Sequence, residues 1–433
     1  MFLRRFEFVE PVKIYSALRD EDYPFLLESA TKHEKRARFS YIGANPEFVV
    51  EISGKGTKVD GKKFSGETNP FKALKEIAKF EKAEGKFVGG FVGYIAYDAV
   101  QNYLGGEVRE KSEFGFYKEI FMVDHVNKQT YFLSLNSAES NPERIIEKAK
   151  RSEIKEEKEN SNILGCDADK DDFIEMVSKA KDYIYEGEIF QVVLSREYRV
   201  SSDLSPLQIY LNLRRINPSP YMFLLEFEKS LVGASPETMA SVENNILKIN
   251  PIAGTAGRGR DEEEDSKIAE SLLSDEKERA EHVMLVDLAR NDVRKVCKAG
   301  SVKVTKFMEV IKYSHVQHIE SEVVGELRED MSCFEAMEAA FPAGTLTGAP
   351  KIRAMEIIDE LEKSKRRVYG GCVGYFSVNN SADMAIAIRM VEIDDAYRIR
   401  AGAGIVADSN PEREFYETEK KMRAVLKALE VVE

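Results

Sequence analysis

The chain is predicted to have an α+β fold, and three features of its 433 residues point to this class. Helix-like and strand-like segments alternate in the second half, but many strands are joined by short turns, as at 243–245, which favours antiparallel pairing. The first 136 residues are mostly short strand-like segments. The chain has no internal repeat and no low-complexity tract. We therefore expect largely antiparallel sheets rather than a doubly wound parallel sheet.

In the first half, short runs of apolar and aromatic residues predict strands over 25–30, 39–43, 48–52, 87–97 and 116–123. Asp60-Gly61 is typical of a hairpin turn. Asn69-Pro70 combines a capping side chain with a proline at the first helical position, so we expect a helix from there to about Lys82. A further helix is expected from Pro142.

The length of the chain exceeds that of one typical core, so two packed units are expected. Residues 148–162 are rich in Lys and Glu and have no apolar stripe, which is typical of a solvated helix end and a linker. We therefore divide the chain into a β-rich domain over 1–150, a charged linker over 151–168 and a second domain over 169–433.

The second half begins with an amphipathic helix from Asp171, and a strand over 189–195 follows it. An acidic helix is predicted over 274–292. The last helix is expected to start at Pro411, with Asn410 or Ser409 as its cap.

The composition excludes several classes of function. A net charge of −13 argues against nucleic acid as the main partner, although local Arg and Lys can still bind anionic small molecules. No apolar run approaches the roughly 18 to 20 residues that span a bilayer. The four cysteines are far apart, form no CxxC pair and follow no secretory leader, so a reducing cytoplasm is the expected compartment.

Near the C-terminus, residues 401–405 read Ala-Gly-Ala-Gly-Ile, which we interpret as a bare glycine loop. Gly402 and Gly404 would let an anionic ligand approach main-chain N–H groups. In the helix that follows, Glu414 and Glu417 share one face. Those carboxylates either compensate the helix dipole or bind a divalent cation.

The acidic helix over 274–292 carries Glu278 and Glu281 on the same face as Leu285. A solvated face with local ion pairs is one interpretation. The other is a Mg²⁺ site formed by Glu281 with Glu417, because this ion takes one or two carboxylates together with waters and an anionic substrate.

His315 and His318 lie on a predicted long strand, on opposite faces, so they cannot readily share a metal. Either is a structural histidine or a general base. Three segments are rich in glycine, at 251–259, 341–350 and 369–374. Each is either a simple turn or a place where a polar ligand meets backbone N–H groups, and none matches the P-loop pattern. Cys372 is interpreted as a buried strand cysteine, because no histidine follows it in the chain.

These segments, taken together with Leu26-Leu-Glu-Ser29, resemble the chorismate-utilising enzymes, and most closely the large synthase subunits of anthranilate synthases. The matching stretches run over 26–30 and from about Asp171 to Leu429. The resemblance implies a large, mostly antiparallel β-sandwich with helices packed outside, and a catalytic domain at 169–433. It also implies amination of chorismate at C2, loss of the C4 hydroxyl and elimination of pyruvate.

The resemblance assigns roles to individual residues. Glu281 and Glu417 would bind Mg²⁺ against the ring carboxylate of chorismate, and Gly402, Ala403 and Gly404 would supply main-chain contacts.

Further contacts to chorismate follow from the same resemblance. Tyr369 and Arg389 would bind the enolpyruvyl carboxylate, for which a guanidinium fork is suited. Gly254 and Thr255 would touch the substrate, and Thr345 would lie near the ring.

Two residues match the family's acid and base. Glu237 would protonate the departing C4 hydroxyl, and a pKa raised by burial would help it to do so. His318, rather than His315, would carry the proton in the elimination.

Two positions indicate the nucleophile. Relatives that form aminodeoxychorismate commonly carry a lysine where this chain has Ala253, and relatives that add water carry a lysine base where it has Gln191. Both substitutions favour ammonia. The alternatives are an aminodeoxychorismate synthase that works without the lysine, or a catalytically silent subunit that senses tryptophan.

The resemblance also implies two partners. The chain has no recognisable glutaminase domain, so a separate glutamine amidotransferase subunit is expected to supply ammonia within a hetero-oligomer. A pocket for the feedback inhibitor tryptophan is expected from Ser29, Pro220, Tyr221 and Met222, which come from both predicted domains. The other interpretation of these segments is a strand end and a proline-rich turn.

Overall fold

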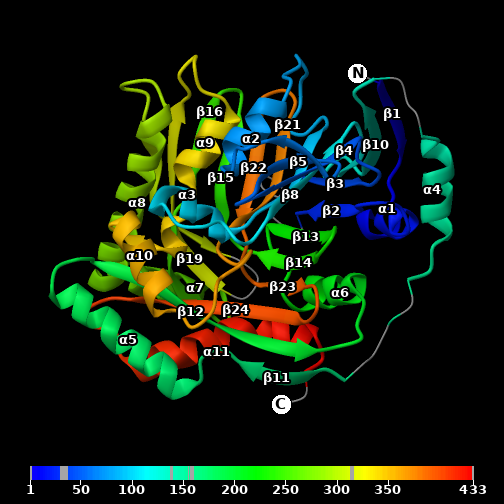
Figure 1. The fold of residues 1–433 in the computed structure, drawn as a ribbon. Coiled ribbons are helices and arrows are strands. Elements are labelled where there is room, and N and C mark those ends of the chain that lie inside the picture. The colour runs from blue at the N-terminus through cyan, green and yellow to red at the C-terminus, as the bar shows by residue number, and fades with distance from the viewer. Residues whose placement is uncertain are drawn as a thin grey trace.

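The computed structural model describes residues 2–29, 38–136, 140–154, 156, 160–312 and 316–431. His315, Ala30 and the side chain of Thr255 lie outside the described part. Two large antiparallel sheets pack face to face, and helices cover their outer faces (Figure 1). The predicted α+β sandwich with outer helices is therefore confirmed.

The first sheet has a continuous order of strands that draws on both halves of the described chain. The order is β1 (Phe2–Glu7), β10 (Gln129–Ser134), β9 (Glu119–Asp124), β3 (Phe39–Gly43), β2 (Phe25–Glu28), β13 (Tyr221–Glu226), β14 (Ser230–Ser235), β23 (Met390–Ile393), β24 (Tyr397–Ile405), β12 (Gln191–Ser201) and β11 (Asn162–Cys166), with β20 (Gly348–Ala349) paired to β12.

The second sheet is built in the same way. Its order is β17 (Ile252–Gly257), β19 (Val316–Glu326), β16 (Ile246–Ile249), β15 (Thr238–Glu243), β22 (Ala382–Ile386), β21 (Cys372–Ser377), β7 (Gly90–Ile95), β8 (Ser112–Tyr117), β4 (Phe48–Ser53), β5 (Gly56–Val59) and β6 (Lys62–Ser65), with β18 (Lys303–Lys312) paired to β19. Pairs such as β2 with β13 and β7 with β21 cross the expected domain boundary. The division into domains stays a prediction. Strands from both predicted domains contribute to each of the two sheets.

Helices pack outside the two sheets. Those on the first sheet are α1 (Pro11–Leu18), α5 (Lys170–Tyr185), α6 (Pro206–Ile216), α10 (Lys351–Leu361) and α11 (Pro411–Ala428), and α4 (Pro142–Arg151) packs against α1. Those on the second are α2 (Pro70–Ile77), α7 (Glu262–Ser274), α8 (Glu276–Val296) and α9 (Cys333–Ala340). The short helix α3 (Gln101–Leu104) and the 3-10 helices η1 (Tyr97–Val100) and η2 (Gly344–Leu346) lie in connections.

The starts of several helices follow from local sequence. α2, α4 and α11 each begin with a proline, and the side chains of Asn69, Asn141 and Asn410 accept hydrogen bonds from the first-turn N–H groups. These caps satisfy donors that the helix itself leaves unpaired. The predicted starts at Pro70, Pro142 and Pro411 are thereby confirmed.

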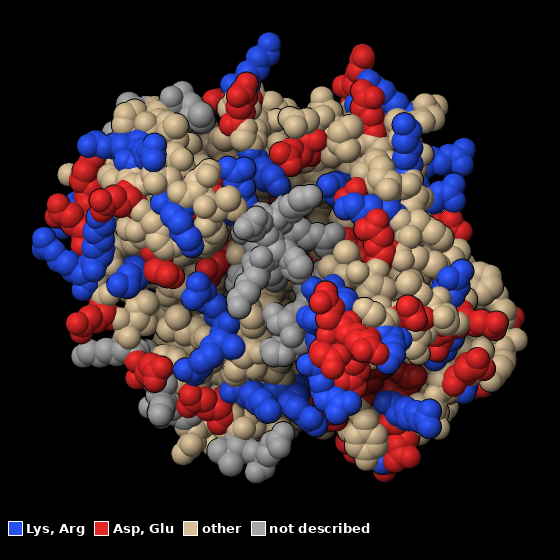
Figure 2. Space-filling model, turned by 180° about the vertical axis from the view of Figure 1, so that it is seen from behind, with Lys and Arg blue, Asp and Glu red and all other residues tan. Residues whose placement is uncertain are grey.

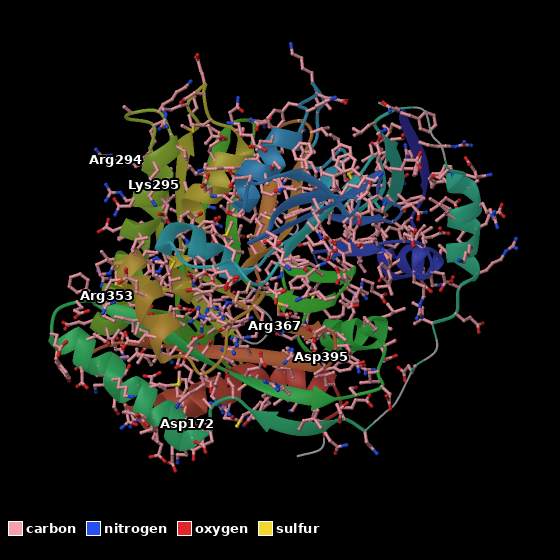
Figure 3. The ribbon with its side chains drawn as sticks, viewed as in Figure 1. Asp172, Arg294, Lys295, Arg353, Arg367 and Asp395 are labelled. Carbon is pink, nitrogen blue, oxygen red and sulfur yellow. The ribbon has the colours of Figure 1, made fainter. Side chains whose placement is uncertain are left out.

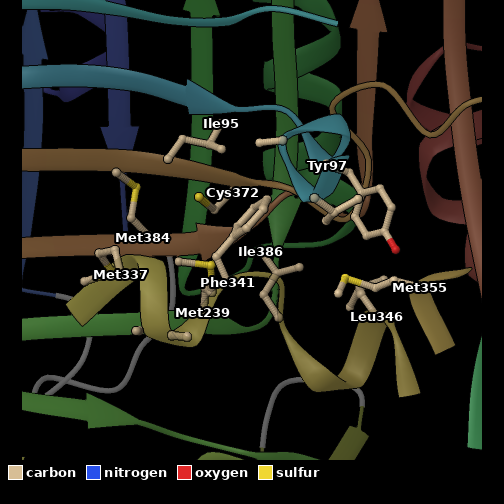
Figure 4. Close-up of a cluster of buried hydrophobic side chains, with 14 of the residues drawn as sticks. Ile95, Tyr97, Met239, Met337, Phe341, Leu346, Met355, Cys372, Met384 and Ile386 are labelled. Carbon is tan, nitrogen blue, oxygen red and sulfur yellow. The ribbon is translucent and has the colours of Figure 1, made fainter. Parts of the chain in front are cut away.

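An aromatic layer fills the space between the sheets. The ring centroids of Phe87 and Tyr375 lie 4.5 Å apart, and those of Phe25 and Tyr117 lie 4.6 Å apart. A second layer lies between the second sheet and its helices, where Met239, Met337 and Met384 surround Phe341 and Ile386 (Figure 4). Burying each such side chain contributes roughly 1.5–3 kcal/mol, so both layers make a stiff scaffold.

Several predicted segments differ from the structure. The expected strand over 116–123 is broken at Lys118, where the chain leaves β8 in one sheet and enters β9 in the other. The expected glycine loop at 401–405 is instead the end of β24, which pairs with β12. Glycine suits this strand because a Cβ on Gly402 would lie 2.7 Å from the carbonyl oxygen of Leu194. Helix α2 ends at Ile77 rather than near Lys82, because the chain becomes extended at Ala78.

The segment expected as a charged linker also contains regular structure. Residues Asn162–Cys166 form β11, an exposed edge strand beside β12.

The surface carries mixed charge. On the face seen in Figure 2, Lys and Arg side chains are interspersed with Asp and Glu. Among the helices of the described part, none combines the length and the apolar character that a membrane crossing requires.

Candidate active site

The predicted site residues cluster where the chain passes from one sheet to the other. Glu237 lies between β14 and β15, and Arg389 lies between β22 and β23. The φ of Arg389 is +53°, in the left-handed region that few non-glycine residues occupy, and the Ala234 N–H donates to its carbonyl oxygen at 3.0 Å. Such backbone strain is common at functional sites, where the surrounding fold holds it.

Glu237 has the environment of a general acid. Its carboxyl borders a small cavity, but protein atoms surround it otherwise, and this desolvation raises its pKa to about 7. A hydrogen bond from Thr345 and the charge of Arg389 partly offset that rise in pKa. The Thr345 hydroxyl donates to Glu237 Oε1 at 2.9 Å. A carboxyl with a pKa near 7 keeps a useful fraction of its proton at neutral pH.

His318 has the environment of a general base. Its Nδ1 lies 2.9 Å from the carbonyl oxygen of Gly254, so Nδ1–H donates there and Nε2 is the basic nitrogen of the neutral ring. Burial lowers its pKa, and the charge of Arg389 lowers it further, so the ring is neutral near pH 7. Gly254 has a φ of +65°. This left-handed conformation favours glycine, and a Cβ there would also lie 3.1 Å from Glu278 Oε2.

Three carboxylates from α8 and α11 influence one another. Burial raises the pKa of Glu278, and the charges of Glu281 and Glu417 raise it further. The sequence pattern placed Glu278 on the same helix face as Glu281, but Glu278 was not predicted as part of the site. Carboxylate oxygens are the ligands that Mg²⁺ prefers, together with waters. These three do not form a ready-made cluster, because among the described residues it is Glu51, Glu113 and Glu228 that bring three such oxygens within 4.8 Å of one another.

Each of the two predicted metal ligands also has a polar neighbour. Gln191 Nε2 donates to Glu281 Oε1 at 3.1 Å. Lys421 Nζ donates to Glu417 Oε1 at 2.6 Å and to the carbonyl oxygen of Gly402 at 2.9 Å. Lys421 was not predicted as part of the site, although its position four residues after Glu417 is a recognisable signal.

The glycines of β24 lie directly beside two buried polar groups. Gly402 and Gly404 pair with Ser195 and Val193 of β12. A Cβ on Gly404 would lie 2.7 Å from Gln191 Nε2, and a Cβ on Gly402 would lie 3.2 Å from the hydroxyl of Tyr369. Ala403, between them, is buried and pairs with Leu194 of the same strand.

Arg389 is the electrostatic centre of the cluster. Burial lowers its pKa, while the neighbouring Tyr369, Glu417 and Glu237 act to raise it. Burial also raises the pKa of Tyr369, and the charges of Arg366 and Arg389 oppose that rise. The structure therefore brings together a guanidinium, a phenol, a protonatable acid and a helix-borne carboxylate.

The family of the chain can be settled by sequence. Residues 22–427 match the family model for chorismate binding enzyme. The chain belongs to the chorismate-binding enzymes.

Relatives of this chorismate-binding enzyme share its full length. It is 61% identical over 435 residues to anthranilate synthase component 1 of Thermococcus kodakarensis, covering 100% of both chains. It is 56% identical over 429 residues to the protein of that name from Archaeoglobus fulgidus, covering 99% of this chain and 100% of the relative. The crystal structure of anthranilate synthase component I from Streptococcus pneumoniae gives a TM-score of 0.79 at 34% identity, covering 90% of this chain and 92% of that chain.

The two positions that bear on the nucleophile are well defined in this chorismate-binding enzyme. Ala253 is buried in β17 and pairs with Ile319 of β19. Gln191 is also buried, and its amide faces Glu281. Neither position offers an amine, and the nearby amine of Lys421 is engaged by Glu417.

A second pocket lies inside the sandwich, between β2, β3 and β13 of one sheet and β21 and β22 of the other. Ser29, Pro220, Tyr221 and Met222 line it together, so the structure unites the four residues from both halves of the chain. The Tyr221 hydroxyl donates to Asp383 Oδ1 at 3.0 Å and accepts from Thr238 Oγ1 at 2.8 Å. Thr238 follows Glu237 in the chain, so one hydrogen bond links Tyr221 of this pocket to the neighbour of the candidate acid.

Proposed function

We propose that the chain is the synthase subunit of an anthranilate synthase, converting chorismate and ammonia to anthranilate and pyruvate. The observation that carries this proposal is its 61% identity, over the full length of both chains, to a protein named anthranilate synthase component 1. Ala253 and Gln191 support ammonia as the nucleophile, because neither side chain can act as the amine used by lysine-bearing relatives.

Substrate binding uses the charged groups of the cluster. Glu281 and Glu417 would hold Mg²⁺, which when bound neutralises the ring carboxylate and polarises the ring. Arg389 and Tyr369 would bind the enolpyruvyl carboxylate, since a buried guanidinium is suited to a carboxylate. Gly402 and Gly404 allow the substrate to approach the strand backbone.

The first chemical step is amination. Ammonia forms a bond to C2, the ring double bonds shift, and the C4–O bond breaks. Glu237 gives its proton to the leaving oxygen, which departs as water. The new ammonium group at C2 then releases a proton.

The second step is elimination. Nε2 of His318 takes the proton from C2, the C3–O bond to the side chain breaks, and the ring becomes aromatic. The side chain gains a proton at its methylene carbon and leaves as pyruvate.

The ammonia would come from a partner. The relatives are named component 1, which indicates a second component, and we propose a glutamine amidotransferase subunit in a hetero-oligomer. We also propose a reducing compartment, since Cys166, Cys297, Cys333 and Cys372 are all free thiols.

The function has a direct test. The purified chain, given chorismate, Mg²⁺ and an ammonium salt at mildly alkaline pH, is expected to form blue-fluorescent anthranilate without a partner. Alkaline pH is needed because only unprotonated ammonia is a nucleophile.

The alternatives give other results in the same assay. Accumulation of nonfluorescent aminodeoxychorismate would mean an aminodeoxychorismate synthase. Absence of turnover, with tryptophan still bound, would mean a silent sensing subunit.

We further propose that the second pocket binds tryptophan as a feedback inhibitor. Its aromatic side chains and Met222 offer apolar contacts, while the charged side chains of Asp383 and Lys86, which also line it, match the two charges of an amino-acid zwitterion. Burial raises the pKa of Asp383 to about 6, so its carboxylate is largely ionised at neutral pH. The Tyr221–Thr238 hydrogen bond offers a short physical link to Glu237.

Filling this pocket is expected to remove inhibition. Ser29→Leu should abolish both inhibition by tryptophan and the rise in Tm that it causes, with turnover kept within about twofold. A ligand at 100 times its Kd stabilises the native state by about 2.7 kcal/mol, which a thermal scan resolves. Ser201→Leu, at the exposed end of β12, is the matched control and should retain inhibition. Unchanged inhibition in Ser29→Leu would contradict the pocket.

A further inference from the structure

A buried guanidinium beside the site has no role in the reaction described above. The side chain of Arg366 is 1% exposed and lies between the end of α10 and Tyr369. Its Nη1 donates to the carbonyl oxygen of Leu346 at 2.6 Å, and its Nη2 donates to that of Val193 at 2.7 Å. Its Nε lies 3.0 Å from Glu362 Oε2, so a carboxylate neutralises the buried charge.

The acceptors of Arg366 belong to segments that carry the site. Leu346 is the last residue of η2 and directly follows Thr345, the donor to Glu237. Val193 pairs with Gly404 across the two strands. The guanidinium of Arg366 therefore links η2, which carries the hydrogen-bond donor to Glu237, to β12, which pairs with the glycines of β24.

The surroundings fix the plane of this guanidinium. It lies over the ring of Tyr97, 4.6 Å from the centroid. Figure 4 shows that Tyr97 lies close to Leu346 and Met355. The main-chain oxygen of Arg366 also accepts from the Tyr369 N–H at 3.1 Å. A planar fork on an aromatic face can hold two carbonyls and a carboxylate at once, whereas a lysine ammonium cannot match these directions.

We propose that Arg366 is a positioning residue that holds η2 so that Thr345 stays hydrogen-bonded to Glu237. This inference depends on the proposed function. Because the Thr345 hydroxyl donates to Oε1, the acidic proton of Glu237 is kept on Oε2, which is the oxygen left to serve the departing hydroxyl. If η2 moves and the hydrogen bond from Thr345 is lost, the proton of Glu237 can occupy either carboxyl oxygen. It is then no longer held on Oε2.

The proposal is tested by a double-mutant cycle with kinetics. Arg366→Lys should lower kcat about 30-fold and Thr345→Val about 100-fold, since small misplacements of a catalytic group cost up to about 10²-fold. KM for chorismate should stay within about threefold in both. The double variant should be no more than about twofold slower than Thr345→Val, because the two changes break the same link.

The neighbouring arginine provides the matched control. Arg367, labelled in Figure 3, donates through Nε to Glu392 at 2.8 Å and also pairs with Asp394, and neither acceptor belongs to η2 or β12. Arg367→Lys should change kcat by the same factor in the wild-type and Thr345→Val backgrounds. This control separates an effect through Thr345 from the general effect of replacing a guanidinium by an ammonium group.

Several outcomes would overturn the proposal. Multiplicative losses in the Arg366→Lys/Thr345→Val variant, or a rise in KM with kcat kept, would show that Arg366 does not act through Thr345. If Arg366→Lys does not fold, Arg366→Gln combined with Glu362→Gln removes both charges together and replaces it in the cycle. A wild-type chain that makes no anthranilate would refute the proposed function itself, whereas an active wild type with a multiplicative cycle would refute only the role of Arg366.

Discussion

Replacing Glu237 by glutamine is expected to lower kcat by about 10³-fold, with KM for chorismate changed by no more than a few-fold. General acid catalysis typically contributes about 10²- to 10⁴-fold, and the amide has no acidic proton to give. The glutamine keeps the shape of the side chain and can still accept the hydrogen bond from Thr345. Initial rates of anthranilate fluorescence at saturating ammonia measure the loss.

The pH dependence of the wild-type enzyme should report the same group. Glu237 is active when protonated, and its pKa is about 7. At a fixed concentration of free ammonia, kcat/KM for chorismate should therefore fall about tenfold per pH unit above neutrality. Glu237→Gln should lack this decline. A decline that survives the substitution would assign the titration to another group.

Stability gives a second measurement that does not depend on turnover. The folded pKa of Glu237, about 7, lies above its ordinary value of 4.5, so between these pH values the native state binds more protons than the unfolded state. Rising pH therefore destabilises the native state, by up to about 3 kcal/mol above pH 7. Glu237→Gln removes this cost, so its gain in Tm should be larger at pH 8 than at pH 5. An equal change in Tm at both pH values would mean that the pKa is not raised.

The sequence predicted those helix starts that depend only on neighbouring residues. The starts of α2, α4 and α11 follow from a capping asparagine and a proline within one turn. The break at Lys118 could not be predicted in this way, because the chain changes sheets inside a continuous run of strand-forming residues. The pairing of Gly402 with Ser195 could not be predicted either. Glycine permits the close approach of a strand that is distant in sequence, but a glycine alone does not indicate which strand approaches.

In the candidate site, too, some features could be predicted from the sequence and others depend on the tertiary structure. The resemblance supplied Glu237, Glu281 and Glu417, because their motifs are long and ordered. The raised pKa of Glu237 required the tertiary structure, since it results from burial and from an incomplete offset by Thr345 and Arg389.

Two further features of the site also needed the fold. Glu278 was recognised on the helix face of Glu281, but only the approach of α11 puts it within range of Glu417. Arg366 carries no signal in the sequence, because its acceptors are mainly backbone carbonyls of distant segments.

Glu417→Gln is expected to abolish turnover at ordinary Mg²⁺ while the fold stays intact. The substitution removes one of two anionic ligands proposed for the ion, and Mg²⁺ binds through few protein carboxylates. The concentration of Mg²⁺ needed for half-maximal activity should rise by at least about 10- to 100-fold, the range seen when supporting groups of metal sites are lost. The Tm of the chain with and without Mg²⁺ gives a second readout, since the stabilisation by the ion should disappear.

Two control variants separate the role of metal ligand from other roles of this helix. Glu414, one turn earlier on α11, accepts a hydrogen bond from Ser409, so Glu414→Gln should leave the Mg²⁺ requirement unchanged. Lys421→Met removes the ion pair with Glu417 but keeps the carboxylate, so it should not weaken Mg²⁺ binding. If Lys421→Met raised the Mg²⁺ requirement as much as Glu417→Gln, the carboxylate would act by holding the lysine. Near-normal turnover of Glu417→Gln at ordinary Mg²⁺ would remove Glu417 from the proposed metal site, because the remaining carboxylates on α8 would then be sufficient to bind the ion.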